Sequence, residues 1–243
     1  MAPDAALPRA VIFDFDGVLV DSEPLHVRAW QVLFAQHGVE ATEEEFEHGI
    51  GMLDADWIRY LFERRGQTAD PRWWQEAKRS VFHELLARNV RPFPGVVDLV
   101  RRLSGEFRLG VASNSWHENI DTALRVLGIR ACFGALTGLD DVERHKPHPE
   151  ACLATASRLG VPPGACVVIE DSPLGIQAAK AAGMRCIGVP NTLPAERLAG
   201  ADLLVGSLAD AEAILRFVRD VPTRQNRLRA ETPPAGEGRG EAS

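Results

Sequence analysis

The stretch VIFDFDGVLVDSE, residues 11–23, ends a short apolar run with two aspartates. Asp14 and Asp16 are two positions apart, and residues with that spacing point the same way in a strand. Two carboxylates about 4 Å apart repel each other by about 4 kcal/mol at an effective dielectric constant of roughly 20. A fold keeps that repulsion only where something offsets it, which is either the water around an open turn or a bound cation.

Similar short apolar runs recur along the chain, and polar residues follow each of them at once. These runs are residues 9–13, 107–112 and 165–170, with further candidates at 184–189 and 201–205. Two-sided apolar runs are typical of a parallel sheet that is buried on both faces. Helical patterns lie between them at 148–160 and 172–183, where Ser172 is a candidate N-cap and Gly160 a candidate stop. The alternation predicts an α/β fold with a Rossmann-like parallel sheet.

Residues 22–91 interrupt this alternation with four consecutive helical patterns. They predict a small α-helical cap that is inserted into the core, which would consist of residues 9–21 and 92–218. The prolines at positions 92 and 94 would stiffen the return linker. A helical insertion hinged beside a strand end can act as a lid. Residues 220–243 are rich in Pro, Gly and charge, and we expect them to form a disordered tail.

Polar side chains follow the predicted strands at the edge where parallel sheets bind their ligands. They are Asp14 and Asp16, then Ser113 and Asn114, and finally Glu170 and Asp171; Lys146 precedes a helix in the turn HKPHPE. Four carboxylates in one place need a cation, and hard oxygen ligands suit Mg²⁺. A lysine, a hydroxyl and a spare carboxylate beside Mg²⁺ suit phosphoryl transfer, with an aspartate as the nucleophile.

The motifs DFDGVLVDS, VASNS, the lysine of HKPHPE and VIEDS, in this order, closely resemble those of the haloacid dehalogenase (HAD) superfamily. The resemblance extends from about residue 9 to residue 215. The insertion directly after the first motif is similar to the subclass with a small helical cap, which contains sugar-phosphate phosphatases and β-phosphoglucomutases.

The resemblance implies a role for each matching residue. Asp14 would be the nucleophile, and Asp16 the general acid and base whose backbone carbonyl also touches the metal. Ser113 would bind the phosphate with Asn114 beside it, and Lys146 would bridge the nucleophile and the phosphate. Asp171 would be a metal ligand, assisted by Glu170 directly or through water. The implied metal set is therefore Asp14, Asp16, Glu170 and Asp171, and the implied cofactor is Mg²⁺.

The cap contributes candidates for substrate recognition. His26 lies about one turn into the first cap helix, where it can contact the substrate or pack beside Trp30. Mutase-like members of the subclass carry a basic residue after a glycine in the cap, to hold a second phosphate. The comparable stretch of this chain, residues 51–56, is acidic, although Lys78 and Arg79 are available on the fourth cap helix. This departure favours hydrolysis over the mutase reaction.

We therefore expect a Mg²⁺-dependent phosphatase that hydrolyses a small phosphomonoester, most simply a sugar phosphate, through an aspartyl-phosphate. The alternatives are a β-phosphoglucomutase-type isomerase, a dehalogenase and a binding protein without activity. Dehalogenation needs neither Mg²⁺ nor Asp16. A binding protein would be expected to lack one of the core residues, and Asp14, Asp16, Lys146 and Asp171 are all present.

The composition agrees with this expectation. Hydrophobic residues make up 45% and charged residues 25% of the 243 positions, and the net charge is −7. This balance is ordinary for a globular protein and argues against the broad basic surface that binds nucleic acid. The N-terminal segment shows no signal-peptide pattern, and no apolar run reaches the roughly 20 residues that span a bilayer. We expect a cytoplasmic monomer whose partner is a small-molecule phosphate ester, with neither nucleic acid nor membrane as a partner.

Overall fold

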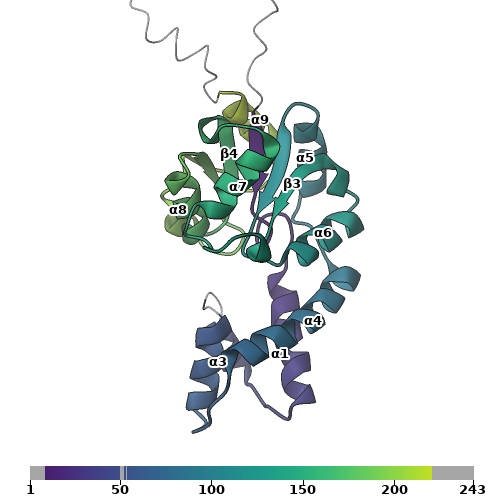
Figure 1. Cartoon of the computed structure of the whole chain (residues 1–243), viewed down its shortest axis with the longest axis vertical. Coiled ribbons are helices and arrows are strands. Elements are labelled where there is room, and N and C mark those ends of the chain that lie inside the picture. The colour runs from purple at the N-terminus through teal and green to yellow at the C-terminus, as the bar shows by residue number, and fades with distance from the viewer. Residues whose placement is uncertain (1–8, 50–51, 53, 221–243) are drawn as a thin grey trace, which may run out of the picture.

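The computed structural model describes residues 9–49, 52 and 54–220 (Figure 1). In this part of the chain, six strands form one parallel sheet in the order β3-β2-β1-β4-β5-β6. The strands are β1 (Ala10–Phe13), β2 (Arg108–Ala112), β3 (Phe133–Thr137), β4 (Cys166–Glu170), β5 (Arg185–Gly188) and β6 (Leu203–Leu204). Strand β1 is central, pairs with β2 and β4, and is buried along its whole length. The predicted α/β fold with a parallel core is confirmed.

Strand β3 was missed in the sequence. Its run, FGALT, contains a glycine in second position, and this glycine is exposed at the edge of the sheet. A glycine inside a run weakens the apolar pattern by which a strand is recognised. The pairing of β3 with β2 is also irregular, because its register shifts between Leu109 and Gly110 of β2. Strand β6 is shorter than the predicted run 201–205, since only two of its residues pair with β5.

Helices cover both faces of the sheet because alternate strand residues point to opposite sides. Val11 and Phe13 of β1 belong to a core cluster with α5 (Val96–Ser104), α6 (His117–Val126) and α9 (Ala211–Arg219). Ala10 and Ile12 belong to a second cluster with α7 (Glu150–Leu159) and α8 (Pro173–Ala181). The short 3₁₀ helices are η1 (Arg130–Cys132), η2 (Leu139–Asp141), η3 (Pro163–Ala165) and η4 (Ala195–Leu198). All strand pairings are parallel, so the carboxyl ends of the strands lie at one edge of the sheet, where a site is expected.

The four helices predicted for residues 22–91 are present: α1 (Glu23–Gln36), α2 (Glu43–Gly49), α3 (Asp54–Glu63) and α4 (Pro71–Asn89). They stand away from the sheet in Figure 1, and α1 and α4 lead back to it. Their own apolar cluster is centred on Trp30, Trp57 and Trp74. The division into a core and a cap at residues 21/22 and 91/92 stays a prediction. Of the predicted tail 220–243, all but Asp220 lies outside the described residues.

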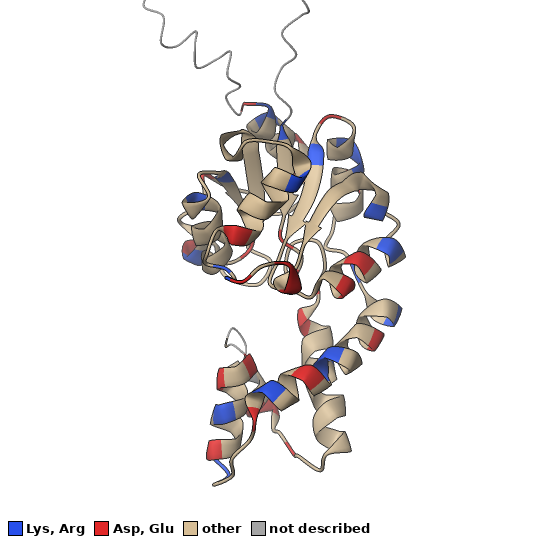
Figure 2. Cartoon of the chain, viewed as in Figure 1, with Lys and Arg blue, Asp and Glu red and all other residues tan. Residues whose placement is uncertain are grey.

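The cap meets the core mainly where α4 crosses α6. The Arg79 guanidinium lies over the Trp116 ring at 3.9 Å, and His83 Nδ1 lies 2.8 Å from Asn119 Oδ1. Acidic and basic residues alternate along α4, and acidic residues lie at the end of α3 that faces the core (Figure 2). None of the helices within the described ranges is both long and apolar enough to cross a membrane.

Candidate active site

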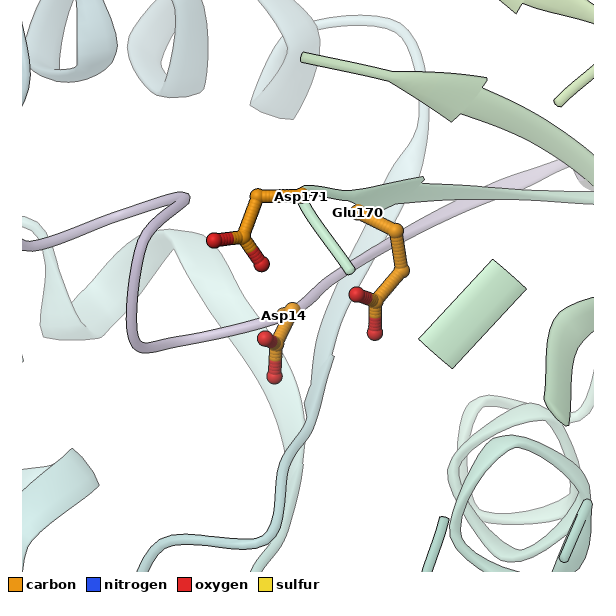
Figure 3. Close-up of side chains that lie close together, drawn as sticks. All are labelled: Asp14, Glu170 and Asp171. Atoms are coloured by element: carbon orange, nitrogen blue, oxygen red, sulfur yellow. The ribbon is translucent and has the colours of Figure 1, made fainter. Parts of the chain in front are cut away.

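Three carboxylates converge at the carboxyl edge of the sheet (Figure 3). Asp14 follows β1, Glu170 ends β4, and Asp171 comes directly after it. One oxygen of each lies within 4.8 Å of the others. The three side chains come together because β1 and β4 are neighbours in the sheet. All three residues are buried, and Glu170 is entirely inaccessible.

Two glycines allow this close approach. Gly17 has φ +74°, and a Cβ atom at this position would lie 1.9 Å from Asp171 Oδ2. Gly175, in the first turn of α8, would place a Cβ atom 1.9 Å from the Glu170 carboxyl carbon. Neither position tolerates a side chain while the carboxylates stay where they are. The glycines are therefore part of the site, and Gly17 also needs the left-handed conformation that glycine adopts without strain.

Lys146 lies between two of the carboxylates. Its Nζ donates a hydrogen bond of 2.8 Å to Asp14 and a second one to Glu170. Burial alone would lower the pKa of Lys146, but the charges of Asp14 and Glu170 raise it well above its ordinary value. Lys146 is therefore a permanent cation. The Asn114 side chain accepts a hydrogen bond of 3.1 Å from the Lys146 backbone, so the predicted phosphate-binding amide also fixes the lysine turn.

The carboxylates outnumber this one ammonium, and their pKa values show the imbalance. Burial and the charge of Glu170 raise the pKa of Asp14 well above its ordinary value, and Lys146 offsets only part of the effect. Burial and Glu170 likewise raise the pKa of Asp171 to about 7. Uncompensated negative charge of this kind is what a bound cation relieves.

Asp16 is turned toward hydroxyl groups instead of the other carboxylates. Its side chain accepts hydrogen bonds from Ser22 and Ser115, and His26 Nε2 lies 3.8 Å from Oδ1. Burial alone would raise the pKa of Asp16, but these three partners hold it below its ordinary value. Asp16 is therefore ionised at neutral pH in this arrangement. The His26 ring stacks on Phe82 of α4 at 4.0 Å, so this residue of α1 contacts a second cap helix and also lies near the core aspartate.

Ser113 is buried at the end of β2, and its hydroxyl accepts a hydrogen bond of 3.1 Å from the Ser115 backbone. The predicted site residues of the core thus lie at this edge of the sheet, and His26 of α1 lies 3.8 Å from Asp16. Lys146 contacts Asp14 and Glu170, and Asp171 lies within 4.8 Å of both carboxylates, whereas Asp16 and Asn114 have other partners.

Several polar residues of the site were not identified in the sequence. They are Ser22 and Ser115 on Asp16, Thr192 on Asp171, and Asn191, whose side chain donates to the Gly17 carbonyl at 2.8 Å. Asn191 and Thr192 follow β5 after only Val189 and Pro190. The rule that polar residues beyond strand ends form the site would have found them if it had been applied to the fifth strand.

A model of the haloacid dehalogenase-like hydrolases matches residues 11–189. The chain belongs to this family. The predicted resemblance is therefore confirmed, and the protein is an enzyme of the hydrolase class.

Individual relatives cover the same region. Fructose-1-phosphate phosphatase YqaB of Escherichia coli is 34% identical over 179 residues, which are 74% of this chain and 95% of that protein. Protein SUPPRESSOR OF QUENCHING 1 of Arabidopsis thaliana is 38% identical over 194 residues, 76% of this chain, but the chain spans only 18% of its length. The crystal structure of β-phosphoglucomutase from Clostridium difficile superposes with a TM-score of 0.70 and 27% identity, covering 88% of this chain and 98% of the other.

Proposed function

We propose that this hydrolase removes the phosphate group from a sugar phosphate or a similar small phosphomonoester. The observation that carries the proposal is the contact of a buried Asp14 with the permanently charged Lys146, beside two further carboxylates. An aspartate held in this way can attack phosphorus, and the lysine can hold the phosphoryl oxygens. The similarity to a phosphatase of fructose 1-phosphate supports both the reaction and the substrate class.

The carboxylates fit a magnesium ion. Asp14, Glu170 and Asp171 offer hard oxygen ligands within 4.8 Å of one another, and burial together with the charge of Glu170 raises the pKa values of Asp14 and Asp171. These residues, with the backbone carbonyl of Asp16, would hold Mg²⁺. Bound there, the ion would offset the charge of the carboxylates and of the phosphate as the nucleophile approaches it.

Each residue of the site then has a separate role in the reaction. Asp14 attacks phosphorus and forms an aspartyl-phosphate, while Asp16 gives a proton to the leaving oxygen. Water subsequently attacks the aspartyl-phosphate, with Asp16 as the base. Lys146 and the Ser113 hydroxyl hold the phosphoryl group. Because Asp16 is ionised where it contacts Ser22 and Ser115, it must take up a proton before it can act as the acid.

A β-phosphoglucomutase-type isomerisation is the second candidate, and the likeness to a solved β-phosphoglucomutase favours it. It shares these steps except that a sugar hydroxyl, rather than water, accepts the phosphoryl group. Such an enzyme has to bind a bisphosphate. The Lys78 side chain, which could serve a second phosphate, is already paired with Asp54, and this counts against the mutase.

The test is phosphate release from p-nitrophenyl phosphate and a panel of hexose and hexitol phosphates, with and without Mg²⁺. We expect Mg²⁺-dependent release that disappears in Asp14→Asn. No release from any ester, together with conversion of β-glucose 1-phosphate to the 6-phosphate when a bisphosphate primer is added, would establish the isomerase instead. Release that does not depend on Mg²⁺ would contradict the proposed role of the carboxylate cluster.

A further inference from the structure

The cap contains a pocket of about 280 Å³ between its helices. Residues from α1, α3 and α4 line it together with Phe46 and Gly49 of α2, and three of them carry formal charges at neutral pH: Glu23, Asp54 and Lys78. Trp30 and Trp57 form its apolar wall. The pocket is therefore a shaped cavity with a few polar groups, which is the usual form of a small-molecule site.

One end of the pocket lies at the catalytic residues. His26 lines the pocket and also lies 3.8 Å from Asp16. Glu23, which lines it too, directly follows Ser22, the residue that donates a hydrogen bond to Asp16. A phosphate ester held at Asp14 would therefore extend its organic part along α1 toward this pocket.

The only ammonium among the lining residues is already engaged. Lys78 Nζ donates to both oxygens of Asp54, at 3.1 and 2.9 Å, and lies 4.7 Å from the centre of the Trp30 ring. The Lys78 side chain is 7% exposed, whereas that of Asp54 is 38% exposed. The partner that solvent or a ligand reaches is thus mainly the carboxylate. Hydrogen-bond acceptors, and not a free cation, face the pocket.

Glu23 adds a second carboxylate, so the lining residues carry two negative charges and one positive charge when His26 is neutral. A second phosphate group on the substrate is a hydrogen-bond acceptor with a charge of about −1.5 to −2 at neutral pH. In the pocket it would meet carboxylates, which are also acceptors and also negatively charged. Hydroxyl groups of a sugar or polyol are uncharged donors, and carboxylate oxygens can accept from them. Sugar rings and chains can also pack against the apolar lining, in which Met52 is 37% exposed and Trp30 and Trp57 are nearly buried.

We propose that the cap pocket selects substrates whose organic part is uncharged and rich in hydroxyl groups, and that the Asp54–Lys78 pair excludes substrates with a second phosphate. This inference rests on the proposed phosphatase function and adds the substrate class and the residues that determine it. The preferred substrates are monophosphates of hexoses or hexitols. Sugar bisphosphates, in which the second phosphate would reach the cap, are poor substrates.

The test compares kcat/KM for a hexose 6-phosphate, a hexitol 6-phosphate and the corresponding hexose 1,6-bisphosphate, in the full chain with Mg²⁺. We expect the wild-type enzyme to prefer the monophosphates by about tenfold or more, because like-charge contacts in a binding site are strongly unfavourable. Asp54→Asn removes the negative charge and leaves the Lys78 ammonium to meet the second phosphate. This variant should reduce the preference by about tenfold, mainly through a higher kcat/KM for the bisphosphate.

Two further variants separate this effect from general damage. Lys78→Met leaves Asp54 without its ammonium and should increase the preference for monophosphates. Asp56→Asn is the matched control, because Asp56 lies in the same first turn of α3, pairs with Arg59 and does not line the pocket. It removes the same charge and should leave the preference unchanged. Circular dichroism and Tm establish that each variant is folded.

The outcomes are distinct. Equal kcat/KM for monophosphates and the bisphosphate in the wild type would overturn the inference while the phosphatase function stands. Equal effects of Asp54→Asn and Asp56→Asn on the preference would also overturn the inference. The effect would then come from the general negative charge of the cap and not from contact between Asp54 and the substrate. Absence of turnover for every ester would refute the proposed function, and this inference with it.

Discussion

The described chain buries two lysines, and their surroundings differ. Lys146 in the core contacts Asp14 and Glu170, with Asp171 beside them. Lys78 in the cap is paired with a single carboxylate, that of Asp54. Three carboxylates thus face one ammonium in the core, while the cap pair is balanced. The excess of negative charge in the core calls for a further cation, and the cap pair does not.

The difference in charge balance suits the core site to catalysis and the cap pair to substrate recognition. In the core, burial and the charge of Glu170 raise the pKa of Asp14 and Asp171, so added positive charge should stabilise the site. In the cap, the Lys78 ammonium has its partner and a tryptophan ring, so the pair acts mainly by what it presents to the pocket. Variants that alter the two lysines and their partners should therefore change different properties.

The largest expected effect comes from Asp14→Asn. The amide cannot attack phosphorus, so kcat should fall by about 10⁴-fold or more. The same change removes one of the crowded charges, and the metal-free protein should therefore unfold at the same or a higher temperature. Both are measured, as phosphate release and as Tm in the presence of EDTA. A large loss of Tm together with the loss of activity would mean that Asp14 is primarily a structural partner of Lys146.

The second test replaces each buried lysine by methionine. Lys146→Met should lower kcat by about 10²–10³-fold, since the group that holds the phosphoryl oxygens is lost, and it should lower Tm because the carboxylates lose their ammonium. Lys78→Met should change the free energy of unfolding by no more than about 1 kcal/mol, because Asp54 is accessible to water and methionine packs well. Equal changes of Tm in the two variants would refute the contrast between the sites.

Much of the core site, though not the Asp54–Lys78 pair of the cap, could be predicted from the sequence. Asp14, Lys146, Glu170 and Asp171 lie beyond strand ends or in a turn that the apolar runs predict, and the structure brings them together. The parallel sheet brings Asp14, Glu170 and Asp171 together, because adjacent parallel strands end at one edge. The strand ends do not place Lys146, which lies in the turn before α7. The cap helices were predicted because their caps are local, as in the reciprocal hydrogen bonds between Thr42 and Glu45.

Other features depend on contacts that the sequence does not show. Strand β3 is an edge strand interrupted by Gly134, so its apolar signal is weak. Lys78 of α4 and Asp54 of α3 are 24 positions apart on the chain, and their pairing depends on how the two helices pack. The contacts of Asp16 with Ser22 and Ser115 likewise depend on how the chain turns after β1. Patterns of local sequence contain no information on such distances.

The pH dependence of stability should follow from the raised pKa of Asp171. A carboxyl group whose pKa is about 7 in the folded protein and near 3.8 when unfolded binds more protons in the folded state between these values. The metal-free protein should therefore lose stability as the pH rises from about 4 to about 7, on the order of 3 kcal/mol.

Added Mg²⁺ should restore Tm at pH 7 and have little effect at pH 5. Urea unfolding across this pH range, with EDTA or Mg²⁺, gives the measurement, and Asp171→Asn should flatten the profile. A metal-free stability that rises steadily from pH 5 to pH 7 would contradict the direction of the shift. Asp54→Asn is the control, because it leaves Asp171 and its neighbours in place, and it should keep the pH profile of the wild type.

The smallest expected effect comes from the loss of a single hydroxyl group beside the core carboxylates. Thr192 donates a hydrogen bond to Asp171 Oδ2 and thereby holds the carboxylate that would bind the metal. Thr192→Val should raise the Mg²⁺ concentration for half-maximal activity by about tenfold, because residues that orient metal ligands contribute about this much to affinity. The kcat at saturating Mg²⁺ should stay close to that of the wild type.

Thr155→Val is the matched control, since Thr155 is buried in α7 and its hydroxyl bonds Thr137 and backbone carbonyls instead of a carboxylate. It should lower Tm without changing the Mg²⁺ requirement. If both variants shift the Mg²⁺ requirement equally, the effect is one of general stability, and Thr192 does not position Asp171. If only Thr192→Val shifts the Mg²⁺ requirement, the hydrogen bond from Thr192 holds Asp171 in position for a cation. The core site, with its excess of negative charge, then depends on such positioning, whereas the balanced Asp54–Lys78 pair of the cap does not.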